Sequence, residues 1–392
     1  MYKRFFPVIF VLLSLAACKE DKTSPIENDG KAPGPVSDVQ VENLPGAARL
    51  TYKAPGDEDM LYVEAHYDIR EGQERIARSS LYKNYMMLEG FGDSSTHNVT
   101  LYAVDRGLNK STPVEITVHP KTPPVYDVFK SLSMAASFGG MGLSMKNSTE
   151  ANIAIVVITP DSLGEMSPAE TFYTSRIAGD FYVRGYDTVK RTFGIYVRDR
   201  WNNLSDTLFE ELTPLFEAKL DKTKFRKVDL PTDYNKANQN GAQVMEHLWD
   251  DSRSENDFTT LPGFGLPQWF TFDLGIKSKL SRMVVWTRTS SRFLYQSGAV
   301  KKWEIYGSNS PAPDGSWDSW TLLMRCESIK PSGLPVGTNS QEDLDFVNAG
   351  WEFTFPPDAP PVRYIRWKTL ENWGNVTHIT LTEMDLFGAP EQ

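Results

Sequence analysis

The segment PQWFTFDLG (Pro267–Gly275) carries the pattern that decides the fold, because its apolar and polar residues alternate. Phe270, Phe272 and Leu274 share one face of an extended chain, and the residues between them share the other. A period of two is typical of a β-strand with one buried face. We therefore expect Trp269–Leu274 to form such a strand.

Two further segments repeat this alternation. In Arg363–Lys368, Ile365 and Trp367 face one side while Arg366 faces the other, and Leu381–Phe387 alternates in the same way. Clusters of Gly, Pro, Ser and Asn separate these short aromatic and β-branched runs. This spacing predicts an antiparallel β-sandwich at the C-terminal end of the chain.

Five blocks in the same region also resemble a known family. They are LWDDS, PQWFTFDLG, KKWEIYGSN, VRYIRW and TEMDLFG, and they follow one another between Leu248 and Gly388. In this order they resemble the coagulation-factor type C, or discoidin-like, family. The resemblance implies an eight-stranded jelly roll over residues 244–390, in a family that includes many carbohydrate-binding modules. The chain departs from the family at Asp257–Thr260 and carries an insertion around Ser328–Asn348.

The N-terminus reads as a secretion signal. Lys3 and Arg4 precede the short apolar run Phe5–Leu15, which has too few residues to span a bilayer. The ending LAAC resembles a bacterial lipobox, which implies lipidation of Cys18; the alternative is an ordinary signal peptide with an incidental cysteine. The following Lys-Glu-Asp resembles an acidic export tag, so we expect a lipid anchor in the outer membrane, a chain facing the cell exterior, and a flexible tether over 19–34.

The amino-acid composition of the chain limits the kinds of partner that we expect it to bind. With 41 Lys and Arg against 51 Asp and Glu, the net charge is −10, which argues against nucleic acid as a ligand. Cys18 and Cys326 are the two cysteines of the chain. If Cys18 carries lipid, Cys326 has no partner for a disulfide within the chain.

Residues 35–122 read as a first β-sandwich. VSDVQVENL, ARLTYKAP, LYVEAHYDIR and NVTLYAVD are successive strand patterns separated by turns. Their order, over about 90 residues, resembles fibronectin type III domains. The prolines at Thr122–Pro124 mark a boundary, since proline cannot continue a sheet ladder.

A second sandwich is expected at 123–220 as a duplicate of the first. LYAVDRGLNKST (Leu101–Thr112) matches IYVRDRWNNLSD (Ile195–Asp206), with Asp105 and Asp199 at equivalent places. We expect both aspartates to accept backbone N–H groups in a turn rather than to form a charged site. Residues 221–243 follow as a linker whose mixed charges are expected to face solvent. The chain is thus predicted to be all-β, with three tandem β-sandwiches.

Catalytic motifs are missing from the sequence. There is no GxSxG, HExxH, CxxC or Walker motif, and the five histidines show no zinc-ligand spacing. A pair of carboxylates for glycoside hydrolysis is defined by distance in space and stays open. We nevertheless expect a binding protein and not an enzyme.

The discoidin-like resemblance also implies a structural Ca²⁺ site. Asp250 and Asp251 fall in a predicted turn, and Glu383 stands at the family position that completes such a site. A hard cation needs several oxygen ligands of this kind. The alternative is that Asp250 caps the turn and Glu383 pairs with an arginine.

Two loops of the last domain, TRTSSRFLYQSG (Thr287–Gly298) and LENWGNVT (Leu370–Thr377), carry candidate ligand-binding residues. Sugars bind to aromatic faces, with Arg, Asn and acidic side chains bonding their hydroxyls. In the family, the two connections reach the same end of the sandwich. For Trp373 the alternative is packing beneath the loop, and for Arg288 a structural role at a strand end. The candidates are Arg288, Arg292, Phe293, Tyr295, Asn372, Trp373 and Asn375.

The sequence thus predicts a surface lipoprotein that captures a polysaccharide or oligosaccharide for an uptake system. An alternative is a protein-interaction or adhesion module, such as an accessory subunit of an outer-membrane transport complex. A divergent glycosidase is a third reading.

Overall fold

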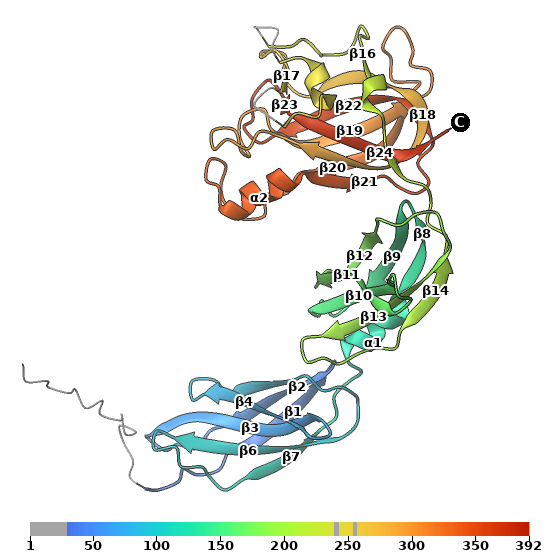
Figure 1. Cartoon of the computed structure of the whole chain (residues 1–392). Helices are drawn as coiled ribbons and strands as arrows, with labels where there is room; N and C mark the ends of the chain where they lie inside the picture. The colour runs from blue at the N-terminus through green and yellow to red at the C-terminus, as the bar shows by residue number, and fades with distance from the viewer. Residues whose placement is uncertain (1–29, 239–242, 254–256, 392) are drawn as a thin grey trace, which may run out of the picture. The chain divides into compact units, whose positions relative to one another are not determined.

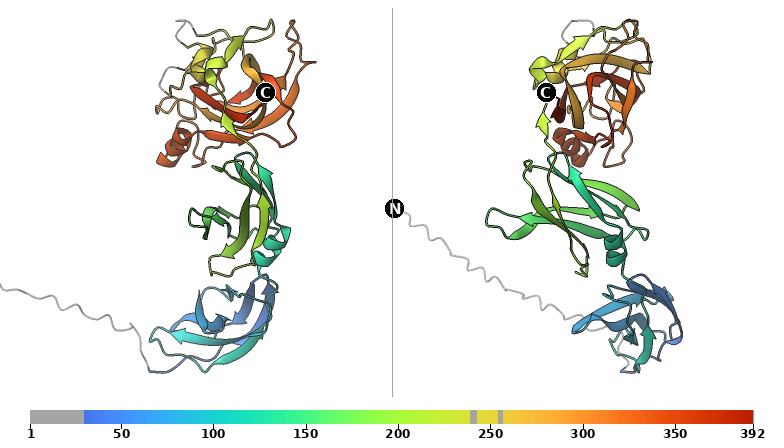
Figure 2. Two further views of the ribbon diagram at one scale, coloured as in Figure 1. Left: turned by 45° about the vertical axis from the view of Figure 1, so that its right-hand side comes forward. Right: turned by 90° about the vertical axis from the view of Figure 1, so that its right-hand side faces the viewer.

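The computed structural model describes residues 30–238, 243–253 and 257–391. β-strands dominate this part of the chain, and only two α-helices occur among the described residues (Figures 1 and 2). The prediction of an all-β protein is confirmed. The predicted signal peptide, with Cys18, and residues 19–29 of the predicted tether lie outside the described residues. No helix in the described ranges is long and apolar enough to cross a membrane.

The first domain is a β-sandwich of two antiparallel sheets, ordered β1-β2-β5 and β4-β3-β6-β7. Buried side chains from both sheets meet in one core, including Leu50 and Leu88 from the first sheet and Val63 and Leu101 from the second. Burial of this apolar area drives the packing of the two sheets. The strands are β1 (Ser37–Leu44), β2 (Ala47–Lys53), β3 (Met60–Arg70), β4 (Gln73–Ser80), β5 (Tyr85–Glu89), β6 (His97–Asp105) and β7 (Val114–Val118).

The second region begins with a helix that the sequence pattern did not predict. Helix α1 (Pro124–Ser131) has proline at its first position, where the missing N–H costs no helical hydrogen bond. Two sheets follow, ordered β11-β10-β13-β14 and β12-β9-β8. The strands are β8 (Ser133–Ser137), β9 (Gly140–Lys146), β10 (Ile153–Pro160), β11 (Met166–Thr174), β12 (Ala178–Val183), β13 (Arg191–Asp199) and β14 (Leu208–Leu212).

The repeated turn of the first two domains has the same hydrogen bonds in both copies. Asp105 Oδ1 accepts from the backbone N–H of Asn109 at 2.8 Å, and Asp199 Oδ1 accepts from that of Asn203 at 2.9 Å. The amide groups of both asparagines also donate to the second oxygen of the aspartate. The prediction that these aspartates satisfy backbone donors in a turn is confirmed.

The C-terminal domain is built on an eight-stranded sheet with the order β15-β24-β18-β22-β19-β20, and β16 and β21 also pair with β18. The pair β17-β23 closes one end. Its elements are β15 (Ala218–Lys219), η1 (Lys222–Lys224), β16 (Arg226–Val228), η2 (Met245–Trp249), β17 (Phe258–Thr259), β18 (Gln268–Trp286), β19 (Val300–Ser308), β20 (Thr321–Glu327), α2 (Gln341–Ala349), β21 (Trp351–Thr354), β22 (Val362–Asn372), β23 (Thr380–Leu381) and β24 (Glu383–Pro390).

Strand β18 contains the predicted strand Trp269–Leu274 and is much longer than expected. Its first half pairs with β22, and its second half pairs with β24 and β21, after a register shift that follows Asp273. Phe270, Phe272 and Leu274 are completely buried, as the alternation predicted. Trp303 and Trp367 stack at 5.0 Å in the same core.

The prediction fails on the second face of this sheet, which is also covered. Arg366, expected to face solvent, has no exposed surface, and its Nη2 lies 3.2 Å from an equally buried oxygen of Asp233. Glu383 is buried too, against Lys222. Asp233 and Lys222 both belong to the segment 221–243, which the sequence suggested was a solvated linker. Instead, β16 of this segment pairs with β18, and the segment shields the charged face of the sheet.

The predicted insertion around Ser328–Asn348 folds into helix α2. Ser340 caps this helix, since its side chain accepts from the N–H of Asp343 while the Asp343 carboxylate accepts from the N–H of Ser340. Cys326 lies nearby in β20, buried and free of any disulfide within the described residues.

Candidate ligand-binding site

The structure brings the two predicted loops together at one end of the C-terminal domain. Residues 287–299 follow β18, and residues 373–379 follow β22. The backbone N–H of Gly374 donates to the carbonyl of Ser297 at 2.9 Å, and that of Trp373 donates to the carbonyl of Ala299 at 2.9 Å. These bonds fix one loop on the other, so their side chains form one surface.

Phe293 is the aromatic centre of this surface. Its half-buried ring has the guanidinium of Arg288 at 4.3 Å from the ring centroid and that of Arg292 at 5.6 Å. Cations at this distance over an aromatic face are attracted by the ring quadrupole. The result is an aromatic ring with two guanidinium groups packed against it, both of which can donate hydrogen bonds.

The two arginines differ in how firmly they are held. Arg288 donates to Asp257 Oδ1 at 2.6 Å, and Asp257 itself is completely buried and accepts from Thr259 as well. Arg292 is exposed and forms no ion pair with any described residue. Arg288 is therefore a fixed part of the wall, whereas the charge of Arg292 is available to a ligand.

A neutral imidazole lies beside this pair. Burial lowers the pKa of His378, the positive charge of Arg288 lowers it further, and Asp257 partly opposes both effects. The ring nitrogen Nε2 lies 3.2 Å from the Ser297 hydroxyl. At neutral pH, His378 thus offers an uncharged donor or acceptor to its surroundings.

Two of the predicted ligand-binding residues support this surface from beneath instead. Tyr295 is completely buried, donates to the carbonyl of Ile329 at 2.7 Å and has its pKa raised by burial to about 12, so its prediction as a surface contact is corrected. Asn372 is also buried, and its amide donates to the carbonyls of Val376 and His378.

Trp373 is only partly buried and packs against the core, as the alternative interpretation proposed. Its indole N–H donates to the hydroxyl of Ser328 at 2.9 Å, and its ring meets Tyr295 edge-on at 5.1 Å. Asn375 is exposed at the tip of the loop with a φ of 50°. Of the second loop, therefore, Asn375 and part of Trp373 face a potential ligand.

The three carboxylates predicted to bind Ca²⁺ do not converge on an empty space. Asp250 Oδ1 accepts from the N–H of Ser252 and caps the turn, again as the alternative interpretation proposed. Asp251 and Glu383 each lie 2.8 Å from the ammonium group of Lys222, which also contacts Asp385 at 2.5 Å. Among the described residues there is no group of three side chains that could hold a metal ion.

The ammonium of Lys222 supplies the positive charge in this cluster. Burial opposes its charged form, but the hydrogen bonds to Asp251, Asp385 and Glu383 outweigh burial and hold the pKa of Lys222 above its ordinary value. Burial raises the pKa of Glu383 to about 7, with Lys222 acting in the opposite direction. The cluster thus joins the segment before β16 to the first residues of strand β24.

We compared the sequence with models of protein families and the structure with solved structures. Three family models match, each described as a domain of unknown function: DUF4959 over residues 33–120, DUF5126 over 121–223 and DUF5000 over 248–388. A solved SusE-like protein is 35% identical, with a TM-score of 0.46; the match covers 69% of this chain and 100% of that one. The chain belongs to the SusE-like family. No curated protein matches the sequence.

Two other solved structures resemble this SusE-like chain more distantly. The C-terminal domain of a chitobiase from Bacteroides fragilis is 18% identical, with a TM-score of 0.33, over 45% of this chain and 100% of that one. A two-domain fibronectin type III segment of chicken tenascin is 16% identical, with a TM-score of 0.22. This match covers 46% of this chain and 99% of the tenascin segment. At these scores, neither adds to the assignment.

Sequence reasoning missed three residues of this SusE-like protein that matter at the surface or beneath it. Asp257 lies where the chain departs from the discoidin-like pattern, and Lys222 lies in the segment read as a linker. Phe264 is 60% exposed and stacks on Tyr234 with a centroid distance of 4.1 Å. Its loop adjoins the site, because the N–H of Gly263 donates to the Thr377 hydroxyl. An aromatic between two glycines in PGFGLP was the signal that could have found it.

Proposed function

We propose that this SusE-like protein is a cell-surface protein that captures a polysaccharide or oligosaccharide with the loop end of its C-terminal domain. The observation that carries this proposal is the arrangement of Phe293 with Arg288 and Arg292. A sugar ring has an apolar C–H face and a rim of hydroxyls. The Phe293 ring suits the face, and the two guanidinium groups suit the rim.

The rigidity of the site supports a binding role. Arg288 is held by Asp257, and the loop of Trp373 is held by Asn372, so neither has to be ordered when a ligand arrives. The site is an open surface and buries little apolar area on the ligand. We expect modest affinity, with dissociation constants from about 10 μM to 1 mM.

Membership of the SusE-like family supports a place in a glycan-utilisation system. In this proposal, lipid on Cys18 anchors the chain in the outer membrane, and the C-terminal domain delivers glycan to transporter components. The protein binds its ligand and does not cleave it. A discoidin-like ancestry of the C-terminal domain remains part of the proposal, resting on the five sequence blocks between Leu248 and Gly388.

Affinity electrophoresis of the chain from Lys19 to Gln392, in gels that contain one soluble glycan each, tests this function. We expect retardation by at least one glycan and its loss in Phe293→Ala. Phe216→Ala is the matched control, because Phe216 is 57% exposed and lies beside β15, which pairs with the opposite end of β24. Retardation by a glycan that persists in Phe293→Ala would move the site elsewhere. No retardation by any glycan would favour the protein-interaction alternative.

A further inference from the structure

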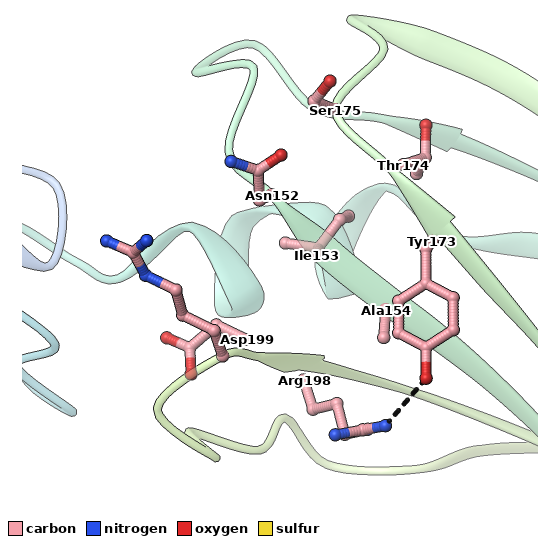
Figure 3. Close-up of a pocket in the computed structure, with 9 residues that line it drawn as sticks. Asn152, Ile153, Ala154, Tyr173, Thr174, Ser175, Arg198 and Asp199 are labelled. Carbon is pink, nitrogen blue, oxygen red and sulfur yellow. Dashed lines mark hydrogen bonds between the residues drawn. The ribbon is translucent and has the colours of Figure 1, made fainter.

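A second aromatic surface with an arginine lies on the sheet β11-β10-β13-β14. Tyr173 in β11 and Arg198 in β13 are both paired with Ala154, in the strand between them. Side chains of residues paired directly across strands project from the same face. Tyr173, Ala154 and Arg198 therefore form one row across three strands (Figure 3).

The small side chain in the middle of this row leaves a hollow. Ala154 ends at Cβ, so Tyr173 and Arg198 rise on both sides of it. Figure 3 shows the phenol and the guanidinium turned toward each other over this gap, and an Arg198 Nη2 donates to the Tyr173 hydroxyl at 3.3 Å. The pocket has a volume of about 370 Å³, within the range of sites for small ligands.

The lining of the pocket is chemically mixed. Tyr173 is 75% exposed, so most of its ring is open to a ligand. Asn152, Thr174 and Ser175 add an amide and two hydroxyls to the rim. Arg198 forms no ion pair with any described residue, although the chain as a whole carries a net charge of −10. The guanidinium of Arg198 is therefore available to pair with an anion, beside the Asp199 carboxylate that also lines the pocket.

We propose that this pocket binds an acidic sugar, a uronic acid residue of a glycan. The pyranose ring packs on Tyr173 above Ala154, and its carboxylate accepts two hydrogen bonds from the fork of Arg198. The choice of a sugar rests on the proposed function. The carboxylate of the ligand and the position of its site are inferred from the geometry of Tyr173, Ala154 and Arg198 alone.

The first loop of the C-terminal domain repeats this chemistry. There, Phe293 stands beside Arg292, whose guanidinium is likewise without an ion pair among the described residues. Two separate surfaces of one acidic chain thus each combine an aromatic ring with a guanidinium that has no ion pair among the described residues. This recurrence favours an acidic glycan over a neutral one as the ligand of the second domain.

Saturation-transfer NMR on the chain from Lys19 to Gln392 tests the site. The probes are trimers of galacturonate, glucuronate, mannuronate and guluronate, each beside its methyl ester, in which the carboxylate is neutralised. The background is Phe293→Ala, so that the C-terminal site is silenced. We expect one of the acids to bind and its ester to bind at least tenfold more weakly.

Substitutions of Tyr173 and Arg198 test whether the acidic sugar binds at this pocket. Tyr173→Ala should weaken binding of that acid about tenfold, and Tyr82→Ala, which removes a tyrosine that is 89% exposed in the first domain, should not. Arg198→Gln should abolish the preference for acid over ester. Binding unchanged in Tyr173→Ala, or no binding of any acid in the Phe293→Ala background, would overturn the proposal. Because Phe293→Ala removes only the C-terminal surface, failure here leaves the electrophoresis result of the intact chain unaffected.

Discussion

The ammonium group of Lys222 lies beside two of the three carboxylates that the sequence predicted to bind calcium. The Lys222 side chain is 6% exposed, and its ammonium group lies between Asp251, Glu383 and Asp385. A covalently attached cation needs no binding from solution. It also explains how acidic residues tolerate burial on the second face of the sheet, since a buried charge must be paired.

Lys222→Met should therefore destabilise the C-terminal domain. Removing one partner of a buried ion pair leaves the others uncompensated, and we expect a loss of about 3 kcal/mol in the free energy of unfolding. Lys224→Met is the control, because this lysine is exposed and lies 3.9 Å from its nearest carboxylate. Urea unfolding measures both.

The same experiment tests calcium directly. If Lys222 supplies the cation, adding EGTA to the wild-type protein should leave its unfolding midpoint unchanged. A midpoint that falls in EGTA would show that calcium is bound after all. The Lys222→Met variant would then lose less stability than expected.

Glu383 gives this cluster a pH dependence. Its pKa is raised in the folded state from 4.5 to about 7, so its contribution to stability is fully present below pH 4.5 and is lost as the pH rises to about 7. Between these values, wild-type stability should fall relative to Glu383→Gln by about 1 to 3 kcal/mol. Urea titrations of both proteins at several pH values measure this difference. Parallel stability curves would mean that Glu383 titrates normally.

At the scale of elements, the loop 373–378 depends on one buried amide. Asn372 donates to two carbonyls of the loop and accepts from the N–H of Val376. Asn372→Ala should cost about 1 to 3 kcal/mol, because buried backbone groups lose their partner. It should also weaken glycan binding, as the loop no longer holds its shape beside Ser297.

Asn375→Gly is the matched control for this loop. It removes a side chain at the tip and keeps the positive φ that glycine adopts without strain. We expect its stability to stay within about 0.5 kcal/mol of the wild type. If Asn372→Ala proves equally harmless, the loop is held by its neighbours instead.

The alternation of apolar and polar residues correctly predicted strands that have one apolar face. The prediction failed where another segment of the chain covers the second, polar face of such a strand. Phe270, Phe272 and Trp367 were all correctly expected on the buried face. Arg366 was not, because its burial depends on Asp233, which lies more than a hundred residues away in the sequence. No local pattern shows that a charged segment will return to cover a sheet.

The candidate site shows the same limit. The sequence correctly indicated two loops, and the structure places them side by side. It could not separate side chains that are exposed on the loop, such as Arg292, from those that support the loop, such as Tyr295 and Asn372. That distinction depends on the direction of each side chain and on hydrogen bonds such as Arg288 to Asp257, which cross between distant segments.

At the scale of the whole molecule, the chain combines repeated structure with separate binding surfaces. The turns at Asp105 and Asp199 have the same hydrogen bonds, and the sheet of the C-terminal region has a different strand order from the sheets before it. If both proposed surfaces bind one long glycan, occupation of the first raises the effective concentration at the second. Modest single sites would then suffice for capture at a cell surface.

The central claim is that the surface around Phe293 captures glycan. Calorimetric titration with the glycan that electrophoresis selects tests it most directly, comparing wild type with Phe293→Ala and Phe216→Ala. We expect Phe293→Ala to weaken binding at least tenfold, while its urea unfolding and the binding of Phe216→Ala match the wild type. Equal affinity of the wild type and Phe293→Ala would contradict it.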